Sequence, residues 1–297
     1  MMDLKLKFLY NIHMKKQKIF VIGGPTASGK SALAVRLAQE IQGNVVNGDA
    51  IQVYQDLQIL SARPSKSEMQ DIPHFLFGYI DAWTNYSLAD WLKDIAKIVP
   101  DLKNPVIVGG TGMYLDALVN GVHQIPEIDP EIRKKVRHMP LSEVQNQIKE
   151  YPFKDPQRMR RALEVQLTTG KPLTYFYEQK KIKPIQADFQ VVYILPEREK
   201  VYQSCASRFE IMKKQGAIQE VEHLNNMNAT GGVLKAIGVP EIQAYLNHQL
   251  SETEMTKKVV TATKQYAKRQ MTWFRHHGNP QHIITDISCV KMDEITK

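Results

Sequence analysis

Apolar residues near the start of the chain form a short continuous run and then a longer helical pattern. Residues 19–22 are all apolar and are followed by two glycines. Beyond these glycines, apolar residues recur at the spacing of one helical face from Leu33 to Ile41, and Gly43 ends the pattern. This segment therefore predicts a strand, a glycine loop and a helix.

The same alternation of strands and helices continues along the chain. Short apolar runs predict strands at residues 44–49, 106–108 and 189–195. Between the first two, Ser87 and Asp90 form a capping-box pattern ahead of a helix with one apolar face. Because this alternation is typical of a parallel sheet flanked by helices, we expect an α/β fold.

The alternation stops at about residue 123, and no strand pattern returns before residue 189. In this stretch Asp129 and Asp155 each precede a proline, a pattern that is typical of a helix start. A helical insertion therefore interrupts the core. The expected division is a core of residues 14–122 and 189–290, a helical insertion domain of residues 123–188, and an N-terminal extension of residues 1–13.

Two helices are expected after the strand at residues 189–195. In the first, at residues 197–215, Arg208 lies beside the apolar stripe, which favours an inward orientation, although such an arginine can also extend to solvent. The second helix begins with the capping box of Ser251 and Glu254. Its packing stripe is expected to contain Met255, Val259, Ala262, Tyr266 and Trp273.

The glycine loop matches a phosphate-binding pattern. Residues 24–31 fit G-x-x-x-x-G-K-[ST] between a predicted strand and a predicted helix, which is the context of a P-loop. Backbone N–H groups and the helix N-terminus bind phosphate there, Lys30 adds a positive charge, and Ser31 is placed to bind Mg²⁺. We expect a P-loop NTPase-like sheet that binds a di- or triphosphate group, with the chemistry left open. The predicted binding residues are Gly24, Pro25, Thr26, Ala27, Ser28, Gly29, Lys30 and Ser31.

Two other strand ends are expected in the same crevice, because ligands of open parallel sheets bind at the carboxyl ends of the strands. Asp49 follows the second predicted strand and would face Lys30, although an aspartate at this position also commonly caps a turn. The glycine-rich segment 109–112 follows the third strand and would bring the Thr111 hydroxyl near the P-loop.

The charge balance points to a second kind of ligand. The chain has 39 Lys and Arg against 31 Asp and Glu, a net charge of +8. This excess favours an anionic partner larger than a nucleotide over simple solvated lysines. Three basic clusters, at residues 133–137, 158–161 and 180–183, favour a polyanion-binding surface on the insertion. In the last helix, basic residues interleaved with Trp273 suit contact with a nucleic acid.

The remaining composition limits the class of protein. Only Cys205 and Cys289 are present, which excludes a disulfide scaffold and a multi-cysteine zinc site. No apolar run approaches membrane-spanning length, and residues 1–13 have no signal-peptide cleavage pattern. We therefore expect a cytoplasmic protein without a membrane partner. We also expect a monomer, although no feature of the sequence specifies an oligomeric state.

Several motifs in one order resemble the tRNA dimethylallyltransferase family, and the resemblance runs from about Lys18 to Arg275. The departures are Ala50, where the family often has serine, Lys264, where it often has arginine, and Val239-Pro240 after an Ile-Gly pair. These departures concern individual RNA contacts and not the implied activity. The motifs that carry the resemblance lie at residues 24–31, 48–54, 108–114, 155–164 and 267–275.

The resemblance implies an enzyme that transfers a dimethylallyl group from its diphosphate to N6 of adenine 37 of tRNA. It implies that the P-loop holds the isoprenoid diphosphate rather than a nucleotide, with Mg²⁺ at Ser31. Asp49 would be the general base, and Thr26 and Arg208 would contact the diphosphate. The insertion would grip the anticodon stem. The implied tRNA-binding residues are Asp49, Ala50, Ile51, Gln52, Thr111, Arg133, Pro156, Gln157, Arg158, Met159, Arg160, Lys268, Arg269, Gln270, Trp273 and Arg275.

Three other functions fit parts of the sequence. A small-molecule P-loop kinase would use Asp49 as a base but would leave the basic insertion without a role. A dimethylallyltransferase acting on free adenine nucleotides would need no polyanion groove and would respond little to salt. A non-catalytic RNA-binding module would not need Lys30.

Overall fold

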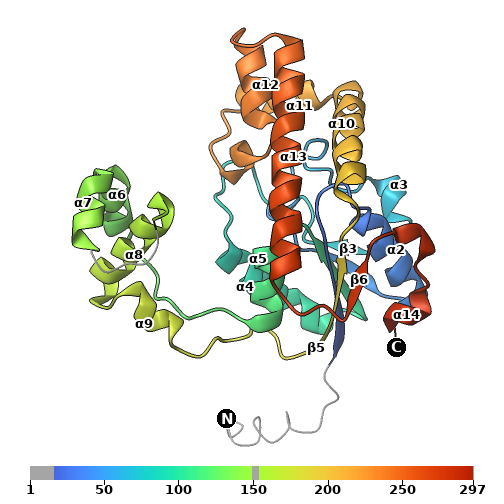
Figure 1. The fold of residues 1–297 in the computed structure, drawn as a ribbon, viewed down its shortest axis with the longest axis horizontal. Helices are drawn as coiled ribbons and strands as arrows, with labels where there is room; N and C mark the ends of the chain where they lie inside the picture. The colour runs from blue at the N-terminus through green and yellow to red at the C-terminus, as the bar shows by residue number, and fades with distance from the viewer. Residues whose placement is uncertain (1–16, 149–153, 297) are drawn as a thin grey trace, which may run out of the picture. The chain divides into compact units, whose positions relative to one another are not determined.

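A parallel sheet forms the centre of the protein in the computed structural model, which describes residues 17–148 and 154–296 (Figure 1). Across these residues the sheet has six strands in the order β3-β2-β4-β1-β5-β6, and all of the pairings are parallel. The predicted α/β fold is therefore confirmed. The strands are β1 (Lys18–Gly23), β2 (Asn44–Asn47), β3 (His74–Phe75), β4 (Pro105–Gly109), β5 (Asp188–Ile194) and β6 (His282–Ile284).

Helices and short 3₁₀ turns connect and cover these strands. The capping boxes of Ser87 and Ser251 form as predicted and begin two of the helices. None of the helices in the described residues is both long and apolar enough to span a membrane. The helices of this core are α2 (Lys30–Ile41), α3 (Lys66–Met69), α4 (Leu88–Ile98), α5 (Gly112–Asn120), α10 (Arg198–Gln215), α11 (Ala217–Asn226), α12 (Val239–Leu246), α13 (Glu252–His276) and α14 (Met292–Thr296), and the 3₁₀ turns are η1 (Val99–Asp101), η2 (Gly232–Lys235) and η3 (Ile287–Cys289).

The middle strands are buried on both faces, which explains their continuous apolar runs. On one face, Ile22 of β1 packs with Leu33 and Leu37 of α2 and with Ile295 of α14. On α13, the ring that reaches the core is Phe274, which is 3% exposed, whereas the expected Trp273 is only half-buried. The predicted packing stripe of this helix was therefore wrong at Trp273.

The P-loop lies between β1 and α2. Gly29 has a φ of +82°, a left-handed conformation that favours glycine, and it immediately precedes α2. The side chain of Ile287 covers it so closely that a Cβ at Gly29 would lie 2.4 Å from Ile287 Cδ1. Arg36 on α2 donates hydrogen bonds to the carbonyls of Ile287 and Val290, at 3.0 and 3.1 Å. The segment after β6 therefore packs on the outer side of the P-loop and its helix.

Residues 120–183 form a second compact unit. It is helical in its described residues, as predicted, and Asp129 and Asp155 cap its helices by accepting hydrogen bonds from the N–H groups of Glu131 and Arg158. It has its own apolar core, which includes Val136 and Leu163. Its helices are α6 (Pro130–His138), α7 (Leu141–Gln147), α8 (Pro156–Thr169) and α9 (Leu173–Tyr177).

The observed limits of the two units differ from the expected ones. The division falls at residues 119/120 and 183/184 rather than at 122/123 and 188/189, and Asp188 already belongs to β5. The core also continues past residue 290, because Ile295 is buried in it. The expected extension at residues 1–13 lies outside the described residues.

Candidate functional site

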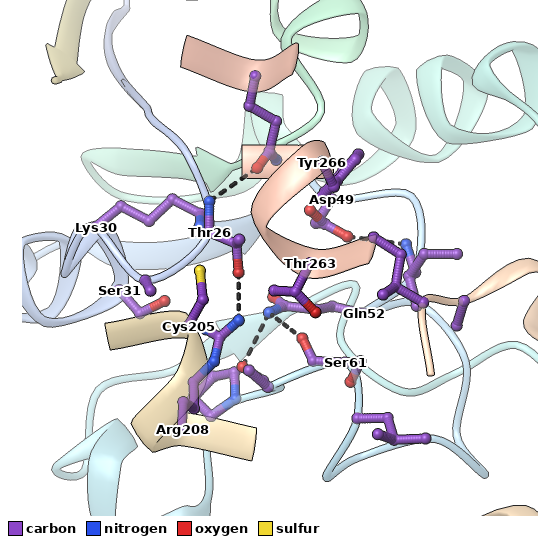
Figure 2. Close-up of a pocket in the computed structure, with 18 of the residues that line it drawn as sticks. Thr26, Lys30, Ser31, Asp49, Gln52, Ser61, Cys205, Arg208, Thr263 and Tyr266 are labelled. Carbon is purple, nitrogen blue, oxygen red and sulfur yellow. Dashed lines mark hydrogen bonds between the residues drawn. The ribbon is translucent and has the colours of Figure 1, made fainter. Parts of the chain in front are cut away.

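A cavity of about 790 Å³ opens at the carboxyl ends of β1, β2 and β4 (Figure 2). The P-loop, the loops after β2 and β4, and helices α10 and α13 supply its walls, and α10 and α13 run side by side. The chain therefore brings together the strand ends that the sequence predicts in one crevice. The polar residues that line the cavity include Thr26, Lys30, Ser31, Asp49, Gln52, Thr111, Arg208, Tyr266, Arg269 and Gln270.

Lys30 is the main positive charge of the P-loop. Its Nζ donates a hydrogen bond to the carbonyl of Pro25 at 3.3 Å. Desolvation lowers the pKa of Lys30 to about 8, opposed by the nearby carboxylate of Asp49 and assisted by Arg208. The buried hydroxyl of Ser28 has no hydrogen-bond partner among the described residues. A P-loop with a desolvated lysine and a hydroxyl that lacks a partner among the described residues is suited to bind an anion.

Thr26 and Arg208 meet at the edge of the P-loop. Arg208 Nη2 donates a hydrogen bond to the Thr26 hydroxyl at 2.5 Å, so the arginine side chain is turned towards the cavity (Figure 2). Desolvation lowers the pKa of Arg208, and the buried thiol of Cys205 lies on the same helix nearby. Arg208 therefore brings a second positive charge from α10 to the P-loop, where an anion would bind.

Asp49 follows β2 and uses its two carboxylate oxygens differently. Oδ1 accepts the N–H of Ile51 at 2.9 Å, and the side chain of Asn47 brackets the Asp49 backbone through two hydrogen bonds of 2.9 Å. Among the described residues, the hydrogen bond to Oδ2 is a long one of 3.5 Å from the Thr111 hydroxyl. The turn-capping and functional interpretations are therefore compatible, because one oxygen caps the turn and leaves the other available on a residue that lines the cavity.

The loop after β4 and helix α13 complete this side of the cavity. The Thr111 hydroxyl accepts the N–H of Ala50 at 3.1 Å and so links two strand ends. Tyr266, which the sequence pattern places in the packing stripe, instead lines the cavity, and burial raises the pKa of its hydroxyl. No local signal separates Tyr266 from the apolar residues of the stripe, because Gln270, four residues later, also looks like an ordinary polar residue of a basic helix.

Several residues predicted to bind RNA make bonds within the protein. Gln52 Nε2 donates to the carbonyls of Ser61 and Ala62, at 3.0 and 2.9 Å. Gln270 is buried and bonds to backbone groups on two loops. By contrast, Lys268, Arg269 and Arg275 are exposed on α13, where Trp273 packs on Gly112 and stacks on His277.

The predicted residues of the second unit also differ in their surroundings. Arg133, Pro156, Gln157 and Arg158 are exposed, and Met159 packs partly against the core of this unit. The guanidinium of Arg160 donates hydrogen bonds to the carbonyls of Val136 and Met139, so it ties α8 to the end of α6.

The chain is similar in sequence to known proteins over most of its length. The IPP transferase family model matches residues 52–277, and the isopentenyl transferase model matches residues 17–82. A tRNA dimethylallyltransferase of Rhizobium johnstonii is 43% identical over 277 residues, covering 86% of this chain and 93% of that protein. One from Zymomonas mobilis is 39% identical, covering 94% and 95% of the two chains.

The chain is also similar to solved structures of enzymes of this kind. The tRNA delta(2)-isopentenylpyrophosphate transferase of Staphylococcus epidermidis is similar with a TM-score of 0.70 at 28% identity, covering 95% of this chain and 98% of that one. A eukaryotic dimethylallyltransferase acting on tRNA is similar with a TM-score of 0.78 at 26% identity, covering 92% and 75%. The likeness includes both the sheet and the segment inserted into it.

Proposed function

This chain belongs to the IPP transferase family, and from that premise we propose that it transfers a dimethylallyl group from dimethylallyl diphosphate to N6 of adenine 37 of tRNA. It is a prenyl-transferring enzyme of tRNA modification. The observation that carries the proposal is the cavity itself, in which Asp49 Oδ2 lies in the same space as Lys30, Thr26 and Arg208.

The chemistry needs a base and a charge-neutralising site. The bond between the prenyl C1 and the diphosphate oxygen breaks, and its electron pair leaves with the diphosphate. A bond forms between C1 and N6 of adenine, and the N6 proton passes to Asp49 Oδ2. An exocyclic amine is a poor nucleophile, so removal of this proton as the bond forms assists the reaction.

The leaving diphosphate would lie against the P-loop. Lys30 and Arg208 would neutralise the charge that grows as the C–O bond breaks, and the Ser28 hydroxyl would donate a hydrogen bond. Ser31 lines the cavity. Its hydroxyl would hold Mg²⁺ together with diphosphate oxygens and water, because Mg²⁺ at phosphate sites usually retains several waters and takes few ligands from the protein. Mg²⁺ would supply additional neutralisation of the diphosphate charge.

The RNA would be held outside the cavity. The exposed basic residues of α13 and the basic clusters of residues 120–183 supply positive charge for its phosphates. Adenine 37 stacked in the anticodon loop could not reach Asp49, so we propose that it leaves the stack to enter the cavity. We further propose that the enzyme acts as a monomer in the cytoplasm.

Transfer of labelled dimethylallyl to unmodified tRNA tests the proposal. Label should be incorporated into tRNA with adenine at position 37 and not into the same tRNA with another base there. In parallel, γ-labelled ATP is offered with small hydroxyl acceptors. Phosphoryl transfer from ATP without any prenyl transfer to tRNA would contradict the proposal and support the kinase.

A further inference from the structure

The buried amide of Gln270 has a role that neither phosphate binding nor RNA binding explains. Gln270 is 6% exposed, whereas Lys268 and Arg269 directly before it are exposed. A buried carboxamide is stable only when both its oxygen and its nitrogen have partners, because an unpaired polar group costs free energy away from water. The partners of Gln270 therefore indicate what the side chain does.

Both ends of this amide bond to backbone groups of loops that line the cavity. Gln270 Oε1 accepts the N–H of Thr26 at 2.9 Å, and Gln270 Nε2 donates to the carbonyl of Gly110 at 2.8 Å. The fit leaves no room for a side chain at residue 110, since a Cβ there would lie 2.4 Å from Gln270 Nε2. Gln270 thus joins α13 to the P-loop and to the loop after β4.

Thr26 is held from two sides as a result. Its N–H is bonded to Gln270. Its hydroxyl accepts the hydrogen bond of Arg208 (Figure 2). The bond to Gln270 holds the backbone N–H of Thr26 in place, and it therefore fixes the backbone that carries the Thr26 hydroxyl. The position of the Thr26–Arg208 pair in the cavity therefore depends on the amide of Gln270.

We propose that Gln270 is a positioning residue, which sets the P-loop edge at Thr26 against the loop at Gly110 so that Thr26 and Arg208 meet the leaving diphosphate. This inference rests on the proposed function. Only a group that accepts at one end and donates at the other can make both bonds. Glutamine and an uncharged carboxylic acid can do so, a carboxylate can make only the bond to Thr26, and a thioether makes neither.

Gln270→Met keeps the approximate size of the side chain and removes both bonds. We expect kcat for transfer to tRNA to fall about 10- to 100-fold, the usual cost of losing a supporting hydrogen bond at a site. The KM for dimethylallyl diphosphate should change much less, because the misplacement of Thr26 matters most when charge develops on the leaving group. An equal loss in kcat and in diphosphate binding would contradict a positioning role.

Gln270→Glu gives a second, pH-dependent test. At neutral pH the introduced carboxylate would repel the Gly110 carbonyl, and on protonation it could make both bonds. Asp49 from the loop after β2, Lys30 from α2, Arg208 from α10 and Tyr266 from α13 share this cavity. The readout is the ratio of variant to wild-type kcat at each pH, because this ratio cancels any pH dependence that the two proteins share. This ratio should rise as the pH falls, and a constant ratio would overturn the inference.

The matched control is Gln265→Glu, the same chemical change at an exposed position of α13, which should leave kcat and its pH profile unchanged. Amide hydrogen exchange of residues 24–31 reports the P-loop directly and should be faster in Gln270→Met.

If the wild-type protein prenylates no tRNA, the proposed function fails. If the wild type is active and both Gln270 variants match it, the positioning role is wrong. Should Gln270→Met not fold, the Gln270→Glu ratio decides alone.

Discussion

At the scale of single residues, the proposed function gives the carboxylate of Asp49 two tasks. Oδ1 holds the turn after β2 by accepting the N–H of Ile51, and Oδ2, with its long contact to Thr111, would take the proton. An amide oxygen can replace the first function but not the second, because an asparagine side chain does not take up a proton at neutral pH. The two tasks can therefore be separated by substitution.

Asp49→Asn should keep the turn and abolish the base. We expect binding of dimethylallyl diphosphate and of tRNA to be retained, and the single-turnover rate of transfer to fall about 100-fold or more. Asp49→Ala is the companion variant, since it also removes the bond to Ile51 and should lower stability as well as rate. A rate close to wild type in Asp49→Asn would remove Asp49 from the role of general base.

If Lys30 binds the diphosphate as proposed, diphosphate binding should depend on pH. The pKa of Lys30 is lowered to about 8 by desolvation, so Lys30 loses its proton as the pH rises through that value. The phosphate oxygens of the ligand are already ionised there, since a second phosphate pKa lies near 6. We therefore expect affinity for dimethylallyl diphosphate to be highest between about pH 6 and 7, to fall as the pH rises through about 8, and binding near and above pH 8 to take up a proton. Calorimetry in buffers of different ionisation enthalpy measures both, and an affinity that stays constant up to pH 9.5 would contradict the assignment.

At the scale of elements, helix α8 carries arginines that the sequence treats alike and the structure separates. Arg158 is exposed, whereas Arg160 donates to the carbonyls of Val136 and Met139. Both follow the cap at Asp155 in one basic cluster, and nothing in the spacing distinguishes them. The difference arises because only the face of Arg160 meets the end of α6.

The two arginines should therefore give different phenotypes. Arg158→Gln should weaken tRNA binding and lower its salt dependence by about 0.7 to 0.9 log units per log salt for one lost phosphate contact. Arg160→Gln should destabilise the protein by about 1–3 kcal/mol, because it leaves carbonyls without their charged donor. Filter binding over a salt series and chemical denaturation measure these effects. Equal effects of both substitutions on RNA binding alone would contradict the distinction.

The sequence predicts the elements of this protein better than it predicts side-chain partners. Strand runs, the P-loop at residues 24–31 and the caps at Ser87 and Ser251 are local signals, and each forms where it is expected. The burial of Gln270 depends on two loops 160 and 244 residues away in the chain. No local pattern encodes that separation, so the amide looks like one more polar residue of a basic helix.

At the scale of the whole molecule, the basic residues decide between tRNA and a free nucleotide as acceptor. The net charge of +8 is spread over α13 and the second unit as well as the cavity. A free nucleotide would engage only the cavity. The two acceptors should therefore respond differently to ionic strength.

We expect transfer to tRNA to be efficient at low salt and to lose kcat/KM steeply between about 50 and 200 mM salt, as for ligands held by several phosphate contacts. Transfer to AMP should be far slower and nearly independent of salt. Parallel assays with both acceptors over one salt series measure this. Salt-independent transfer to AMP at a rate equal to that for tRNA would favour the free-nucleotide enzyme.

Because Ile287 covers Gly29, the surroundings of the P-loop stay incomplete until late in the synthesis of the chain on the ribosome. The P-loop is synthesised early, but the segment that covers it, including the carbonyls bound by Arg36, emerges after roughly 250 further residues. During all of that translation the outer side of α2 lacks its cover, whereas the helices of residues 120–183 have their core within their own segment. A chain released before β6 would therefore carry every residue of the P-loop and still lack the packing that completes it.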